Sequence, residues 1–149
     1  MVTSLGYAWD WAFTIKMLPL LLKGAGMTVL LTICAIIFGT LIGLAIALIK
    51  ITNNSFLNYL GGIYTWVFRG IPLLVQLFII YYALPAAIGI NFTPFQAAVM
   101  GISLCGGAYI AEIIRAGIQS VDKGQMEAAL SLGMSYRQAM RKIIIPQTY

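Results

Sequence analysis

The sequence predicts an all-α membrane protein, and three observations lead to this fold class. Of the 149 residues, 61% are hydrophobic and 9% are charged, whereas about 25% of the residues in ordinary soluble domains are charged. The mean hydropathy is +0.94. The apolar residues also gather in long runs, which cross a bilayer as helices because a helix satisfies its own backbone hydrogen bonds.

The first 23 residues are predicted to form an interfacial segment. The aromatic stretch WDWAF at residues 9–13 is followed by Lys16 and Lys23 on either side of MLPLLL. Aromatic and basic side chains of this kind prefer the headgroup region of a bilayer. The segment lacks the pattern of a cleaved signal peptide, so we expect it to be retained. The alternative for residues 1–23 is a frayed tail.

Residues 24–49 contain no charge and form the predicted span one. Their 26 residues give a helix of about 39 Å, which crosses a hydrocarbon core of about 30 Å with some tilt. Ala35, Gly39, Gly43 and Ala47 recur at every fourth position. Such a stripe of small residues lets another helix approach closely. We expect this partner to be a helix of the same subunit, and a contact between two subunits is the alternative.

Two more spans are predicted after the polar run KITNNS. Span two covers residues 57–84 and is interrupted by Arg69, Gly70 and Pro72, which predicts a kink. The uncharged stretch ALPAAIGINFTP is expected to form a short external loop or a re-entrant turn. Span three covers residues 95–118.

The distribution of Lys and Arg predicts the orientation. Lys123, Arg137, Arg141 and Lys142 lie in the loop at residues 120–142, with Arg115 just before it, whereas the loop between spans two and three has no basic residue. Basic loops stay in the cytoplasm, so the amino terminus is expected outside. Residues 143–149 are too few to span and are predicted to start a fourth span in a chain truncated at its carboxyl end.

The cytoplasmic loop at 120–142 is predicted to form a helix, a turn and a second helix. Asp122 with Gln125 favours a helix start, and Gly133 favours a left-handed helix end. Ser135 with Gln138 has the spacing of a capping box, which restarts the helix. An apolar face over residues 126–130 makes this compact loop suited to contact a protein partner.

At this loop the sequence resembles a known family, the permease subunits of ABC importers. Their EAA loop has the pattern EAA, three residues, G, nine residues, I-x-L-P, and the matching residues here are Glu127, Ala128, Ala129, Gly133, Ile143 and Pro146. Ile145 departs from the pattern, which has Leu there. Two further stretches, FRGIPLLVQLF at 68–78 and AYIAEIIRAGIQSVDKGQ at 108–125, resemble the polar amino acid branch of that family. Together these motifs cover about half of the chain.

The resemblance implies a type I ABC importer transmembrane domain of about five spans, of which this chain holds three full spans and the start of a fourth. It implies a multi-pass subunit of the bacterial inner membrane that transports a polar amino acid and is not itself an enzyme. The EAA loop would couple the spans to an ABC ATPase subunit, which binds the ATP, so no cofactor is expected in this chain. A second permease subunit and an extracytoplasmic amino-acid-binding protein would complete the assembly.

Alternatives to this interpretation stay open. A membrane interaction or regulatory protein would use the same loop only to dock a cytoplasmic partner. Glu127 alone has a simpler explanation, as an acid in the first turn of a helix, where the helix dipole favours it.

Ionisable residues inside the spans need water or a partner, because an unpaired charge in hydrocarbon is costly. Arg69 and Glu112 are predicted to pair across spans two and three, and a pair between Glu112 and Arg115 along one helix is an equal alternative. Gln76 and Tyr109 are candidates for a polar substrate path, although amide and aromatic groups in spans also serve packing.

The composition argues against several other classes of function. There is no His, and the two cysteines, Cys34 and Cys105, lie in separate apolar runs. Zinc and haem therefore lack their usual ligands, so no metal site is expected. The net charge of +5 comes mostly from two short loops, which indicates topology and not affinity for nucleic acid. As a membrane protein, the chain is expected to contact membrane lipids.

Overall fold

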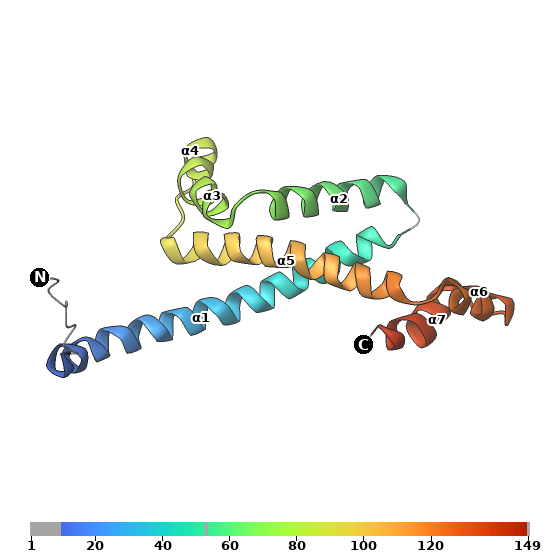
Figure 1. Cartoon of the computed structure of the whole chain (residues 1–149). Helices are drawn as coiled ribbons and strands as arrows, with labels where there is room; N and C mark the ends of the chain where they lie inside the picture. The colour runs from blue at the N-terminus through green and yellow to red at the C-terminus, as the bar shows by residue number, and fades with distance from the viewer. Residues whose placement is uncertain (1–9, 53, 149) are drawn as a thin grey trace, which may run out of the picture.

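The computed structural model describes residues 10–52 and 54–148, and every regular element in these ranges is helical. The elements are α1 (Trp11–Lys50), α2 (Ser55–Gly70), α3 (Leu73–Phe78), the π-helical η1 (Ile79–Ala83), α4 (Leu84–Ile88), α5 (Pro94–Ser120), α6 (Lys123–Ser131), α7 (Tyr136–Ala139), the π-helical η2 (Met140–Ile144) and the 3₁₀-helical η3 (Ile145–Gln147). Figure 1 shows α5 between α1 and α2, with α6 and α7 beyond the end of α5.

Helix α1 extends well beyond the predicted first span. It begins after Asp10, whose Oδ1 accepts a hydrogen bond from the backbone N–H of Phe13 at 3.0 Å. Its 40 residues give a length of about 60 Å, about twice the thickness of a hydrocarbon core. Residue 24 is therefore not a break in the helix, because the Leu-rich stretch before it continues the same helix through Pro19. The headgroup position of residues 1–23 stays a prediction, and residues 1–9 lie outside the described part.

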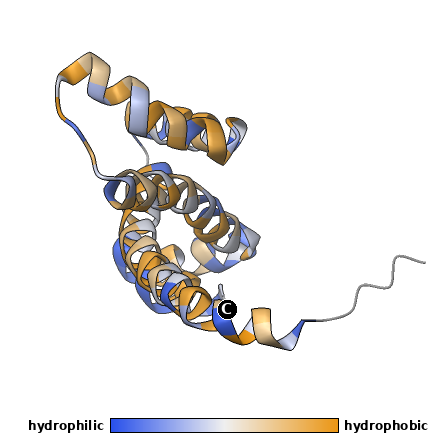
Figure 2. Cartoon of the chain, turned by 90° about the vertical axis from the view of Figure 1, so that its left-hand side faces the viewer, coloured by the Kyte–Doolittle hydropathy of each residue, from blue (hydrophilic) through white to orange (hydrophobic). Residues whose placement is uncertain are grey.

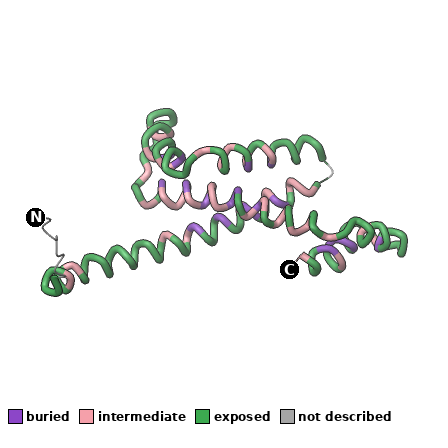
Figure 3. Tube along the Cα trace, in the orientation of Figure 1, coloured by how far each residue is buried: buried purple, intermediate pink, exposed green. Residues whose placement is uncertain are grey.

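The stripe of small residues on α1 packs against α5. Ala35, Gly39, Gly43 and Ala47 are the buried residues of α1, and they lie where the two helices cross (Figure 3). A Cβ atom added at Gly39 would lie 3.4 Å from the carbonyl oxygen of Ser103 in α5. The expected packing within one subunit is therefore confirmed, and the absent side chains are what allow this close approach.

The predicted span two breaks sharply where a kink was expected. Helix α2 ends at Gly70, Ile71 is extended, and α3 starts after Pro72, with an angle of 103° between α2 and the segment Leu73–Ile88. Proline disfavours the helical conformation of the residue before it and has no N–H to donate, which explains the break. The expected interruption at Arg69, Gly70 and Pro72 is present as a sharp break between α2 and α3, and the bounds of span two at 57–84 stay a prediction.

Two helices in the described part, α1 and α5, are long and apolar enough to cross a membrane. A third span results if α2 and the bent segment after it are counted together. The stretch expected to be a loop or a re-entrant turn contains α4, which is followed by Gly89 in the left-handed conformation with φ 72°.

The outer surface of the helices is apolar, as a lipid environment requires. Large apolar side chains such as Leu22, Ile36 and Trp66 are 60–78% exposed, and apolar colours occur on outward-facing sides of the helices in Figure 2. The buried core is correspondingly small and consists largely of Ala and Gly at helix contacts.

Candidate functional site

The segment at 120–142 folds as a helix, a turn and a second helix. The Oδ1 of Asp122 caps α6 by accepting a hydrogen bond from the N–H of Gly124 at 2.7 Å. The segment follows α5 directly, since α5 ends at Ser120 and Val121 is extended. Only two residues, Val121 and Asp122, therefore connect α5 with α6.

Gly133 ends α6 in the left-handed conformation, with φ 80°. The N–H of Met134 donates to the carbonyl of Ala129 at 3.1 Å, and the N–H of Gly133 donates to the carbonyl of Leu130 at 2.9 Å. These two bonds form a Schellman motif. The predicted left-handed turn is confirmed.

Ser135 and Gln138 form the predicted capping box at the start of α7. The N–H of Gln138 donates to the Ser135 hydroxyl at 3.3 Å, and the N–H of Ser135 donates to Oε1 of Gln138 at 2.8 Å. Hydrogen bonds thus close the turn both at the end of α6 and at the start of α7.

The residues of the EAA motif differ in how far they are buried. Ala129 is buried together with Ala139, Met140 and Ile144, which form a small core between α6 and the helices after the turn. Glu127, Ala128, Gly133 and Pro146 are exposed, and Ile143 is half-buried. Glu127 is the fifth residue of α6 and not in its first turn, so its explanation as a first-turn acid is wrong.

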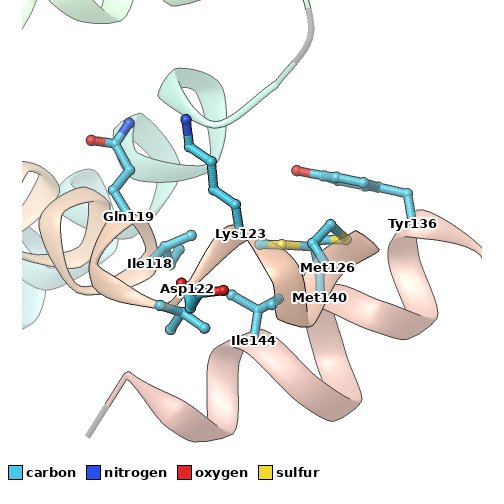
Figure 4. A pocket seen from close by; sticks show the side chains of 9 residues that line it. Ile118, Gln119, Asp122, Lys123, Met126, Tyr136, Met140 and Ile144 are labelled. Atoms are coloured by element: carbon cyan, nitrogen blue, oxygen red, sulfur yellow. The ribbon is translucent and has the colours of Figure 1, made fainter. Parts of the chain in front are cut away.

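A cleft of about 490 Å³ lies between the end of α5, α6 and the helices after the turn (Figure 4). The side chains that line it are Ile118, Gln119, Val121, Asp122, Lys123, Met126, Tyr136, Met140 and Ile144. Met126 belongs to the predicted apolar face, and in Figure 4 it lies next to Met140. This part of the face is therefore turned toward the chain's own helices.

A second candidate site is an ionic cluster inside the helix bundle, which we call the Glu112 cluster: Lys50, Thr65, Arg69, Glu112 and Arg115. The Nζ of Lys50 donates to Oε1 of Glu112 and also to the hydroxyl of Thr65 at 2.9 Å. The Nε of Arg115 donates to Oε2 of Glu112 at 2.8 Å. The Nη1 of Arg69 lies 4.0 Å from Oε1 of Glu112.

Both predicted pairings of Glu112 are therefore present, and the sequence argument missed a third partner. Lys50 and Thr65 come from α1 and α2, so the cluster joins α1, α2 and α5. One signal pointed toward Lys50. Lys50 ends the predicted first span on the side to which the predicted third span returns, so the predicted topology would put Lys50 and Glu112 in the same half of a bilayer.

Arg69 also contacts Tyr109. Its guanidinium carbon lies 5.3 Å from the centre of the Tyr109 ring, within the range of a cation–π contact. The Arg69 side chain is 43% exposed, and Tyr109 is 49% exposed. These two residues therefore present a polar surface at the edge of the Glu112 cluster.

Gln76 is buried at the break between α2 and α3. Its Nε2 donates to the carbonyl oxygens of Phe68 at 2.9 Å and Ile71 at 2.7 Å. The amide thus satisfies backbone groups that the break leaves without helical partners. Contact of Gln76 with a substrate stays a prediction, and its nitrogen is already occupied by these two bonds.

The described residues contain no group of three or more His, Cys, Asp or Glu side chains able to hold a metal ion. The polar chemistry of this part of the chain lies in the exposed surface of 120–142 and in the Glu112 cluster.

Comparison with known families decides the identity of the chain. Residues 35–149 match the family described as binding-protein-dependent transport system inner membrane component. The chain belongs to this family. The matched residues include both the Glu112 cluster and the EAA motif, and the resemblance to ABC importer permeases that the sequence suggested is confirmed.

Several curated relatives are similar over almost the whole chain. An arginine transport system permease protein, ArtQ, of Bacillus subtilis is 40% identical over 94% of this chain. A putative glutamine transport system permease protein, GlnP, of Rickettsia bellii is 46% identical over 91% of it. The chain spans 63–64% of the length of these two relatives.

Solved structures share the fold. A crystal structure of an amino acid ABC transporter with histidines matches with a TM-score of 0.87 and 45% identity, over 95% of this chain and 65% of that chain. An inward-facing MetNI methionine ABC transporter matches with a TM-score of 0.72 at 24% identity, over 89% of this chain and 64% of that one. The second likeness concerns the fold alone. The predicted fold class, a type I ABC importer transmembrane domain, is confirmed.

Proposed function

We propose that this chain is a permease subunit of an ATP-binding cassette importer that carries a polar amino acid across the inner membrane. The two relatives described above are named as an arginine transport permease and a putative glutamine transport permease. In this role the spans form part of the translocation path, and the segment at 120–142 receives the motion of a separate ATPase subunit.

The main support for the coupling role is that the segment at 120–142 has a hydrogen-bonded turn with exposed apolar side chains. Its turn is fixed by the Schellman motif and by the Ser135–Gln138 capping box. Leu132 at this turn is 84% exposed, and Tyr136 is 46% exposed. Exposed apolar side chains on a rigid turn favour a protein partner, because such a partner removes them from water.

The connection to α5 supports the same proposal. Helix α5 carries Glu112 and Arg115 and passes into α6 through Val121 and Asp122. Movement of the docked segment therefore shifts the helix that holds the intramembrane carboxylate. The complete machine would contain two ATPase subunits, a second permease subunit and an extracytoplasmic amino-acid-binding protein, with the amino terminus outside and residues 120–142 in the cytoplasm.

Transport by the natural, full-length permease tests this proposal. The permease is purified with the partners that remain bound to it and is reconstituted in vesicles with its binding protein, and the uptake of radiolabelled L-arginine and L-glutamine is recorded. Uptake of a polar amino acid that requires ATP hydrolysis and the binding protein is the expected result. A complex that still binds a cytoplasmic partner but drives no amino acid uptake would favour the regulatory protein instead.

A further inference from the structure

We propose that Arg69, held against Tyr109, binds the α-carboxylate of the transported amino acid. This inference rests on the proposed amino acid transport and assigns a specific contact within it.

The charges in the Glu112 cluster are unbalanced. Three cations, Lys50, Arg69 and Arg115, surround the single carboxylate of Glu112, which leaves a net charge of +2. Lys50 and Arg115 bind the two carboxylate oxygens directly. The cluster therefore attracts a further anion, since uncompensated positive charge is costly within a membrane.

Of the three cations in the cluster, Arg69 has N–H groups available to bind that anion. Its ion pair with Glu112 is long, at 4.0 Å, and it is the only ion pair of Arg69 among residues 10–52 and 54–148. A guanidinium carries five N–H donors in a planar fork that matches a carboxylate. With 43% of the side chain exposed, compared with 9% for Lys50, the fork is accessible from outside the cluster.

Tyr109 contacts this guanidinium from one side. The guanidinium carbon lies over the ring, 5.3 Å from its centre, in a cation–π contact. Such a contact uses no hydrogen bond of the guanidinium, so its N–H groups are available for a bidentate contact with a carboxylate. An ordered guanidinium loses less conformational entropy when an anion binds.

The position of Arg69 favours a substrate over a lipid headgroup. Arg69 lies directly before Gly70, where α2 ends, and 14 residues beyond the first residue of α2, roughly 21 Å along the helix axis. The backbone of Arg69 therefore lies far along α2 from the loop between α1 and α2, and the Lys50 side chain reaches toward the cluster from the end of α1. Irregular backbone at membrane depth occurs where it is buried in protein or lines a polar cavity, and broken helices carry substrate sites in transporters.

Binding of amino acids and of their amides tests the proposal. The natural full-length permease is purified with its ATPase partner but without the binding protein, and binding of L-arginine and L-glutamine is compared with that of L-argininamide and L-glutamine α-amide. These amides lack the α-carboxylate. We expect Arg69→Gln to weaken binding of the transported acid by about tenfold or more and to remove the preference for acid over amide.

Two further variants make the result specific. Arg69→Lys keeps the charge, and so protects folding, but loses the fork, so binding of the acid should weaken by about three- to tenfold with the amide unaffected. Lys23→Gln is the control, because it removes one positive charge from an exposed position of α1 outside the cluster, and it should keep both the binding of the acid and the preference for the acid.

Full binding and an unchanged acid preference in Arg69→Lys and in a folded Arg69→Gln complex would overturn the proposal. Loss of bound anionic lipid from Arg69→Gln, measured by native mass spectrometry with amino acid binding intact, would assign the residue to lipid and overturn it as well. Absence of any amino acid uptake by the unaltered assembly would instead refute the proposed function, so the two failures are distinguishable.

Discussion

The ammonium group of Lys50, at the end of α1, donates a hydrogen bond to Oε1 of Glu112, which lies 62 residues further along the chain in α5. The same ammonium donates to Thr65 in α2. The side chains of Lys50 and Glu112 are only 9% and 15% exposed. The two hydrogen bonds of one ammonium group therefore join the three longest helices of the described chain.

Removal of Lys50 or Glu112 should leave the other charged group without its ion-pair partner. We expect Glu112→Gln to lower the free energy of unfolding by about 3–5 kcal/mol, because three cations then lose their buried carboxylate. The double variant Lys50→Met with Glu112→Gln should lose less than the sum of the two single changes. Thermal unfolding of the purified complex in detergent measures each value.

The cycle between Arg69 and Glu112 is the matched control for this prediction. Because the Arg69 contact is 4.0 Å long and its side chain is 43% exposed, its coupling should be weaker than that of Lys50. Additive losses for Lys50 and Glu112 would show that their contact contributes no coupling.

Gly43 should tolerate no larger residue. A Cβ atom there would lie 2.7 Å from the Cβ of Ile110 and 2.9 Å from the carbonyl oxygen of Gly107. Gly43→Ala therefore forces α1 and α5 apart, and we expect a loss of about 1–3 kcal/mol from overpacking. Gly26→Ala on the same helix is the control, since a Cβ there meets nothing within 4 Å. Equal melting temperatures for the two variants would contradict the packing described for α1.

Gln76→Leu should loosen the break between α2 and α3. The carbonyl group of Ile71 would lose the amide that donates to it, and that of Phe68 would keep only the Cys105 thiol at 3.6 Å, at a cost of about 1–3 kcal/mol for lost hydrogen bonds. Hydrogen exchange over residues 66–80 should rise in this variant. Unchanged exchange would mean that other contacts hold the break.

The local signals in the sequence predicted local structure well. Gly133 and the Ser135–Gln138 pair each act within a few residues, and the structure has both features as expected. Pro72 predicted where the helix is interrupted but not the 103° bend. That angle depends on Gln76 and on Leu77, which packs on Gly101 in α5, where a Cβ would lie 2.6 Å from Leu77.

The sequence analysis missed the contact of Lys50 with Glu112 because it joins residues that are far apart in the sequence. Each residue has a local explanation, Lys50 as the end of a span and Glu112 as the partner of Arg115. The distance between them depends on how closely α1 and α5 cross, and that distance is set by Gly43 and Gly107. Patterns along one helix do not encode such a crossing in a form that a single sequence reveals.

Substitutions at Gly133 should separate transport from membrane insertion. Its φ of 80° disfavours β-branched side chains, whereas Asn tolerates the left-handed region. A Cβ there meets nothing within 4 Å, so the penalty comes from the backbone alone. We expect Gly133→Val to abolish ATP-driven uptake with the subunit still in the membrane, and Gly133→Asn to keep most of it. Equal uptake by both variants would show that coupling does not need this turn.

The last prediction concerns the orientation of the chain, which we propose from the asymmetry of Lys and Arg. Single cysteines are introduced at Asn91, in the loop before α5, and at Leu132, in the turn after α6, with Cys34 and Cys105 replaced. Leu132 is chosen because it is 84% exposed and because Gln138 is occupied by its capping box.

A membrane-impermeant thiol reagent should label the Asn91 position from outside intact cells and the Leu132 position only after the membrane is opened. The physical reason is that Lys123, Arg137, Arg141 and Lys142 surround the Leu132 position in sequence, and translocation of such a basic loop is disfavoured. Uptake recorded for each cysteine variant confirms that the labelled protein is assembled. Labelling of Leu132 from outside would place the 120–142 segment away from the cytoplasm, and the proposed docking of an ATPase on that segment would then be impossible.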